Sequence, residues 1–161
     1  MTPQEPYVVE RCAEIERILK DAASWASNND MLGANLAAYI TVLIVGTIED
    51  SIEHLVKQRV ARVGDTEIEN YIGEMLDDRF RNPDYSTISG LLGKFSKGYK
   101  QRFQERISYQ GVEARALEGL LGYKNSLAHL GTCNLQMTLS DVDGYYHQII
   151  PILEALEQIL A

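Results

Sequence analysis

The chain has 161 residues, of which 45 % are hydrophobic, and it carries a formal net charge of −8. This length and composition are typical of one globular domain with its own core, spanning residues 1–161, and they exclude a disordered chain. The excess of acidic residues excludes broad, non-specific binding of nucleic acids, although a local basic site remains compatible with it.

Apolar residues at helical spacing predict a first helix over 8–27 and a long second helix over 32–62. The stretch 31–48 has no charged side chain, but it is short for a membrane span and contains Asn35, Thr41 and Thr47. We therefore expect a helix that is buried on several sides, and no membrane span. Asp50 and His54 follow in the same helix, four residues apart, and this spacing predicts a helical ion pair.

The remaining elements are also predicted to be helices, over 67–80, 87–95, 112–129 and 141–160, with a further piece between Gly98 and Gly111. The expected N-terminal capping residues are Thr66, Ser86 and Ser140. A turn is expected at 82–84, an irregular segment at 133–139, and a kink at Pro151 in the last helix. With no segment of strand periodicity, the pattern predicts an all-α fold. We expect an antiparallel bundle of four to five main helices, with a helical insertion between the second helix and the helix over 112–129.

One position in the helix over 112–129 breaks the expected pattern. Leu117, Leu120 and Leu121 form an apolar stripe, and Lys124 falls in the middle of it. An ammonium group in a stripe that is meant for burial is costly unless it finds an anion, a polar partner or a wet interface. Asn125 and His129 lie together on the flank of the stripe, four residues apart.

Structural explanations exist for both charged residues of this segment. Lys124 could extend past its leucine neighbours so that its ammonium reaches water. His129 could simply interact with the last turn of its helix, and Gly131 just beyond is typical of a helix end.

The segment Leu120-Leu121-Gly122-Tyr123-Lys124-Asn125-Ser126-Leu127-Ala128-His129 resembles the motif of the HEPN (higher eukaryotes and prokaryotes nucleotide-binding) family. The usual form is an apolar pair, Arg-Asn, two further residues and Ala-His. The organisation of the chain is similar too, with the pair Ile48-Glu49 on the long second helix. The segment 86–95 resembles the middle part of the toxin- and defence-type members.

The resemblance implies a metal-independent endoribonuclease whose active site forms where two motif helices meet in a homodimer. His129 would then be the general acid or base, which suits a group that titrates near neutrality. Lys124 would hold the scissile phosphate, Asn125 would orient the imidazole or donate to the phosphate, and Glu49 would be a polar companion of the motif. The family usually has arginine where this chain has Lys124, and lysine lacks the planar fork that grips two phosphate oxygens.

A basic segment over 94–106 is a second candidate for contact with RNA. It contains five basic residues and one acid, Glu105, which gives a local net charge of +4. The RNA-binding candidates are Lys97, Lys100 and Arg102. Phe95, Tyr99 and Phe103 recur at four-residue spacing, so they could stack on bases, or they could face the core of an amphipathic helix while the cations face water.

The sequence therefore predicts a cytoplasmic ribonuclease of the HEPN toxin or defence kind, which is homodimeric, acts on RNA, and has an antitoxin or another protein as a further partner. The main alternative is a weakly active or inactive HEPN-like module that binds nucleotides or proteins. A third is a helical partner subunit whose dimer face is the apolar 32–48 stretch. We expect no cofactor and no metal site, since no histidine or cysteine lies at ligand spacing from another. Cys12 and Cys133 are expected to be reduced thiols.

Overall fold

The computed structural model describes residues 3–130 and 137–161, apart from the side chains of residues 78, 79, 129 and 130. All the secondary structure in this part of the chain is helical, which confirms the predicted all-α class. The helices are α1 (Pro6–Trp25), α2 (Asp30–Ala61), α3 (Thr66–Arg79), α4 (Tyr85–Phe95), α5 (Lys97–Arg106), α6 (Val112–Leu130) and α7 (Leu139–Leu160).

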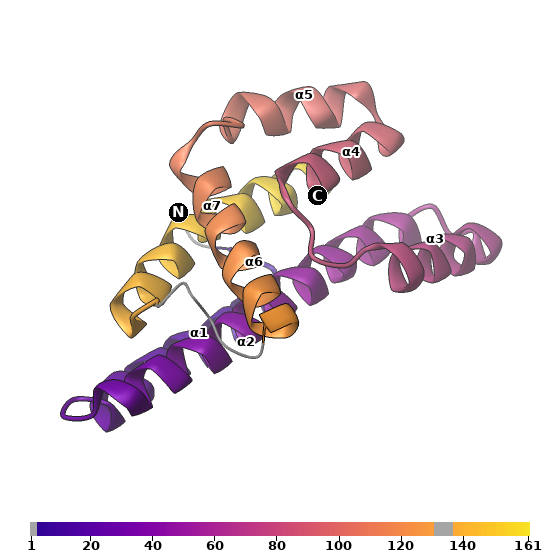
Figure 1. Cartoon of the computed structure of the whole chain (residues 1–161). Coiled ribbons are helices and arrows are strands. Elements are labelled where there is room, and N and C mark those ends of the chain that lie inside the picture. The colour runs from indigo at the N-terminus through magenta and orange to yellow at the C-terminus, as the bar shows by residue number, and fades with distance from the viewer. Residues whose placement is uncertain (1–2, 131–136) are drawn as a thin grey trace.

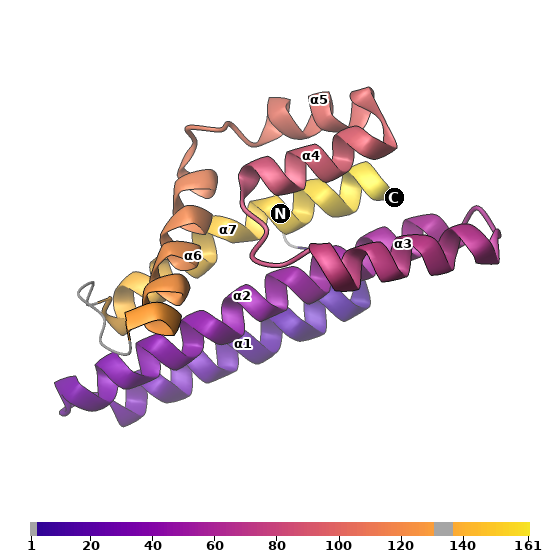
Figure 2. The same cartoon turned by 45° about the vertical axis from the view of Figure 1, so that its right-hand side comes forward.

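Four long helices form the body of the molecule, and three shorter helices form the insertion between α2 and α6 (Figure 1). The helices α1 and α2 make an antiparallel hairpin, and α2 packs against α1, α6 and α7. In the insertion, α3 lies along α2, whereas α4 and α5 pack on each other and α5 reaches α7 (Figure 2). The predicted bundle with a helical insertion is therefore the observed architecture.

The helix starts differ from the predicted ones by one or two residues because a capping side chain upstream of the expected one is used. The observed caps are Asp65 instead of Thr66, Asp84 instead of Ser86, and Thr138 instead of Ser140. An aspartate is a better acceptor for the free N–H groups of a first helical turn than a threonine is. At α7, the Thr138 side chain and the Asp141 carboxylate cap each other's backbone N–H groups in a capping box.

The second helix is the centre of the hydrophobic core. Ile40, Ile44 and Val45 are fully buried against the surrounding helices. Within the described residues α2 is the one helix that is long and apolar enough to cross a membrane, a test that the core helix of a bundle also passes. In its most apolar window 39 % of the residues are buried, so part of this helix remains open.

The open part is a charge-free strip that we call the exposed α2 face, made of Met31, Ala38, Tyr39, Val42 and Gly46. Ala38, Val42 and Gly46 recur at four-residue intervals, Tyr39 lies beside Ala38, and Met31 lies seven residues before Ala38, which places them all on one side of the helix. Met31 is 75 % exposed and Val42 is 44 % exposed. The face is large enough in sequence, about four helical turns, to be a docking surface.

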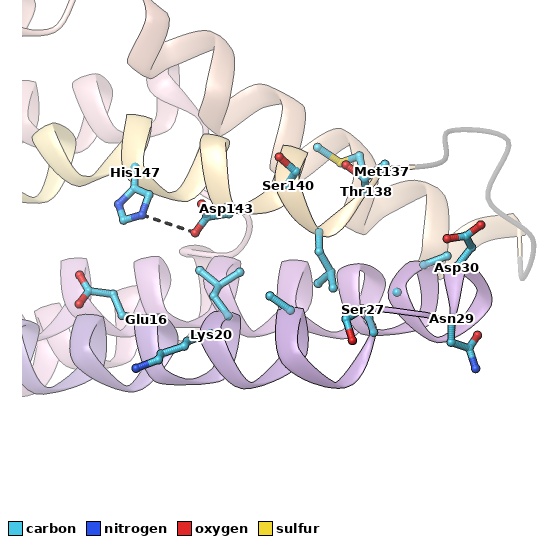
Figure 3. A pocket seen from close by; sticks show the side chains of 16 residues that line it. Glu16, Lys20, Ser27, Asn29, Asp30, Met137, Thr138, Ser140, Asp143 and His147 are labelled. Atoms are coloured by element: carbon cyan, nitrogen blue, oxygen red, sulfur yellow. Dashed lines mark ion pairs between the residues drawn. The ribbon is translucent and has the colours of Figure 1, made fainter.

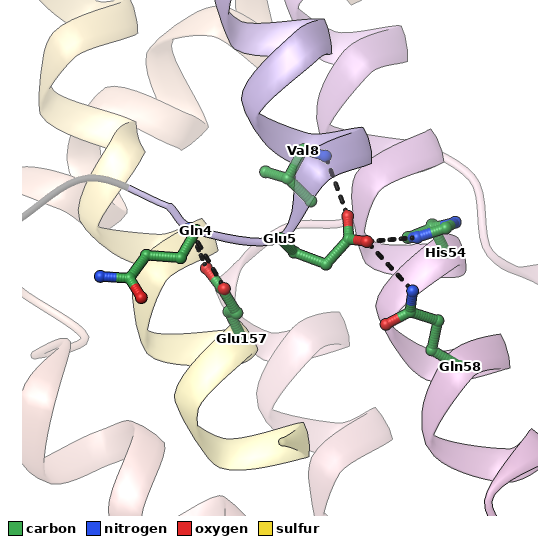
Figure 4. A network of polar contacts seen from close by, with 6 residues as sticks. All are labelled: Gln4, Glu5, Val8, His54, Gln58 and Glu157. Atoms are coloured by element: carbon green, nitrogen blue, oxygen red, sulfur yellow. Dashed lines mark hydrogen bonds and ion pairs between the residues drawn. The ribbon is translucent and has the colours of Figure 1, made fainter.

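The start of the chain is tied to the bundle by a polar network around Glu5 (Figure 4). Its carboxylate caps α1 by accepting from the Val8 N–H at 3.1 Å, and it also lies 3.2 Å from His54 Nε2 and accepts from Gln58 Nε2 at 3.0 Å. Asp50 instead pairs with Arg11 at 3.1 Å. The predicted Asp50–His54 pair is therefore wrong, because each of the two residues meets a partner on or beside α1.

Candidate active site

The last two turns of α6 leave the core. Leu117, Leu120 and Leu121 are buried where α6 packs on α2 and α7, but Leu127 is only half-buried and Ala128 is exposed. Lys124 stands at this boundary, with 24 % of its side chain exposed. The stripe that appears continuous in the sequence is thus buried over its first half only.

Lys124 is held by two groups from other elements. Its Nζ lies 3.5 Å from Glu49 Oε1 on α2 and donates to Asn82 Oδ1 at 2.8 Å. Glu49 is the more enclosed partner, with 13 % of its side chain exposed. An ion pair and a hydrogen bond together explain how a half-buried ammonium is tolerated at this position.

Asn82 closes the network from the loop between α3 and α4. Its backbone N–H donates to Glu49 Oε1 at 2.6 Å, so Glu49, Lys124 and Asn82 each contact the other two. Its backbone has φ of +49°, in the left-handed region that asparagine tolerates better than most residues. The turn at 82–84 was expected from the sequence, but a contact between Asn82 and Lys124 was not, because turn chemistry does not specify where the side chain points.

The two other motif residues lie beyond this network. Asn125 is exposed on α6, and its side chain is free to meet a ligand or a second protein. The backbone of His129 belongs to α6, one helical turn beyond Asn125, but its side chain lies outside the described residues. The structure therefore brings Glu49 to Lys124 and leaves the contribution of His129 as a prediction.

The basic segment forms the end of α4 and the whole of α5, and α5 lies away from the Lys124 end of α6 (Figures 1 and 2). Lys97, Lys100 and Arg102 are all exposed, and the Arg102 guanidinium lies 4.9 Å from the centre of the Tyr99 ring. Phe103 is fully buried. The segment is thus an amphipathic helix whose cations face solvent, and Phe103 cannot stack on a base in this arrangement.

A cavity of about 900 Å³ lies where the C-terminal half of α1 and the N-terminal end of α2 meet the N-terminal end of α7 (Figure 3). Glu16 and Lys20 of α1 are on one side, and His147 of α7 is on the other, 3.5 Å from Asp143. None of the described side chains among the predicted site residues lines this cavity. His147 is exposed and paired within its own helix, outside the motif segment.

The described residues contain no group of three or more histidine, cysteine or acidic side chains that could hold a metal ion. The expected absence of a metal and of a cofactor stays a prediction. Cys12 is a buried free thiol whose pKa is raised by that burial, which makes it an inert core residue, and Cys133 lies outside the described residues.

The chemistry that the described site offers is electrostatic. A cation is fixed at the edge of the core, an exposed amide lies next to it, and a carboxylate is fixed behind it. The Lys124 ammonium can bind a phosphate if it contacts the phosphate while it remains in contact with the Glu49 carboxylate and the Asn82 amide. Comparisons of the chain with protein-family models, with characterised proteins and with solved structures gave no match.

Proposed function

We propose that the protein is a metal-independent endoribonuclease of the HEPN toxin or defence kind, with its active site at a homodimer interface in the cytoplasm. The observation that carries the proposal is the contact between Glu49 and Lys124, 75 residues apart in the chain. The motif resemblance implies that these two residues belong together. The contact supports this reading, because neither helical spacing nor composition requires it.

In the proposed reaction the ribose 2′-oxygen attacks the adjacent phosphorus, and the bond from phosphorus to the 5′-oxygen breaks. A base takes the proton of the 2′-hydroxyl, and an acid gives a proton to the departing 5′-oxygen. His129 of one copy supplies one of these roles and His129 of the other copy supplies the second. Lys124 stabilises the negative charge that develops on the phosphoryl oxygens, and Asn125 donates to the phosphate or orients the imidazole.

The dimer is proposed on the exposed α2 face. Glu49 lies two turns beyond Val42 on the same side of α2, so the face leads directly to the Lys124 network. A strip without charges can pair with its own copy without placing like charges opposite each other, which matters for a chain of net charge −8. A second copy seated there would bring two motif ends together.

Outside the site, we propose that Lys97, Lys100 and Arg102 hold RNA phosphates. All three are exposed on α5, in the one strongly basic segment of an acidic chain. Phe103 is buried and does not stack on a base, so the proposed contact is the electrostatic one made by these three cations.

One observation favours the alternative of an inactive nucleotide-binding or protein-interaction module. The Lys124 ammonium already has Glu49 and Asn82 as partners, and a resident carboxylate competes with a substrate phosphate for the same charge. A lysine in such a network can be a structural cation.

Replacing Lys124 with arginine separates the two functions. If Lys124 holds phosphate, Lys124→Arg should raise the rate of RNA cleavage, because a guanidinium can bind Glu49 and still present a fork to the phosphate. Lys57→Arg is a matched control, since Lys57 is also ion-paired, at 3.1 Å from Asp77, on another surface. EDTA should leave the rate unchanged. If neither the wild type nor Lys124→Arg cleaves RNA while both remain folded and dimeric, the nuclease proposal fails and the interaction module replaces it.

A further inference from the structure

A groove opens between α3 and α4, away from Lys124. Among the described helices α3 packs on α2 alone, so α3 and α4 diverge from the loop that joins them (Figure 2). The space between them has a volume of about 580 Å³. Its walls are aromatic and aliphatic, formed mainly by Tyr71, Ile72, Met75, Phe80, Leu91 and Phe95.

Three described acidic residues of α3 lie away from this groove. Glu69, Glu74 and Asp77 line the opposite side of α3, where Asp77 pairs with Lys57 of α2 at 3.1 Å. No described carboxylate lines the groove between α3 and α4. The described part of the groove wall therefore carries no negative charge, in a chain of net charge −8.

One cation stands in the groove wall. Lys94 lies in the last turn of α4, is exposed, and has no ion pair or hydrogen bond with a described residue. Thr87, two turns before Lys94 on the same face of α4, adds a hydroxyl near the joined end of the helices. The described walls of the groove thus combine an apolar surface with one positive charge, that of Lys94, at the end away from the loop between the helices.

We propose that this groove binds a small amphipathic organic anion, with the acyl or other apolar part between α3 and α4 and the carboxylate on Lys94. Ligand pockets typically measure about 300–1,000 Å³ and are mostly apolar, with a few polar groups that fix the orientation of the ligand. The apolar part contacts Met75, Leu91 and the aromatic rings. The absence of described acids in the walls selects an anion over a cation of the same length.

The proposal is tested by titrating decanoate into the full chain, below its micelle concentration, with decyltrimethylammonium as the cation of matched tail. Decanoate should bind with one site per chain, and its affinity should fall as salt is raised. Equal affinity for decanoate and decyltrimethylammonium, or no binding of either, would overturn the proposal.

Gly90 is a position where a larger side chain would occupy the groove without contacting neighbouring residues at its Cβ. It lies in the groove wall, and a Cβ built on it meets no other atom within 4 Å. Gly90→Ala adds a methyl group and should leave binding nearly unchanged, whereas Gly90→Leu places an isobutyl group where the tail lies. Each methylene kept out of the groove is worth about fourfold in affinity, so displacing two or more should weaken decanoate binding by about tenfold or more.

A charge variant keeps the test decisive if Gly90→Leu folds poorly. Lys94→Gln should weaken decanoate binding by about two- to fivefold and should abolish most of its salt dependence. Lys20→Gln, on α1 and outside the groove, is the control and should bind decanoate as the wild type does. If Lys94→Gln and Lys20→Gln behave alike, Lys94 does not receive the carboxylate and the proposal is wrong.

Discussion

Glu49 places a negative charge beside Lys124 at the edge of the core, and the contribution of this ion pair to stability is measurable. Glu49→Gln keeps an oxygen for the Asn82 N–H but removes the negative charge that faces Lys124 at 3.5 Å. We expect it to lower the free energy of unfolding by about 1 kcal/mol, since the pair is partly shielded from water.

The coupling between the two charges follows from a double-mutant cycle with Lys124→Met. Urea unfolding at one fixed protein concentration should give an interaction energy of about 0.5–1 kcal/mol. A coupling indistinguishable from zero would mean that Asn82, rather than Glu49, determines the position of Lys124.

At the level of residues, the sequence predicted that Lys124 needs a polar partner, but it identified only one of the two partners that the structure shows. An ammonium in an apolar stripe requires a polar neighbour, which is a local argument. Glu49 was implied by the motif resemblance alone, and Asn82 was not foreseen. Asn82 reaches Lys124 because its backbone is left-handed, at φ +49°, and no local pattern specifies that conformation for an asparagine before a proline.

At the level of elements, the first helix relies on Glu5. Burial acts to raise the pKa of this carboxyl, but the hydrogen bond from Val8 and the contacts with His54 and Gln58 outweigh it and hold the pKa below its ordinary value of 4.5. Glu5→Ala should therefore reduce the free energy of unfolding by about 1–2 kcal/mol at neutral pH. Glu10→Ala, at an exposed position of the same helix, should change it little.

The same variant has a defined pH dependence. Because the folded pKa of Glu5 is lower than its unfolded pKa, its stabilising effect is complete above about pH 4.5 and is lost as the pH falls through the folded pKa. Urea unfolding from pH 7 to pH 3 should show the difference between wild type and Glu5→Ala shrinking on the acid side. A difference that grows with acidification would contradict the assigned contacts.

The existence and order of the helices were predictable because their apolar periodicity is strong, whereas their starts were not. At Asp84 and Thr138 the capping oxygen lies two residues before the expected one, because several polar residues stand together and the tertiary position of the helix selects among them. The direction of the α5 aromatics was also open in the sequence. Phe103 turned inward because α5 packs on α4 and α7, which is a tertiary effect.

At the level of the whole molecule, the exposed α2 face should determine assembly. Val42→Glu places a carboxylate in the proposed contact and should raise the dimer dissociation constant by at least about tenfold, because a desolvated charge without a partner is costly. Val9→Glu is a matched control on α1, as Val9 is 43 % exposed and Val42 is 44 % exposed. Light scattering across micromolar concentrations measures both.

The outcome of that comparison bears directly on the site. A wild type that is monomeric throughout this range, or equal weakening by Val42→Glu and Val9→Glu, would count against the exposed α2 face as the dimer surface. The helical bundle would stand unchanged, but the composite active site would lose its basis.

The most direct test of the proposed nuclease is cleavage of a single-stranded RNA in the presence of EDTA by the wild type, His129→Ala and His147→Ala. Each variant replaces one imidazole with a methyl group, and His147 lies exposed on α7, outside the motif. We expect His129→Ala to reduce the cleavage rate by roughly 10²–10⁴-fold and His147→Ala to leave it unchanged. Equal rates for His129→Ala and the wild type, or no cleavage by a folded, dimeric wild type, would contradict the proposal.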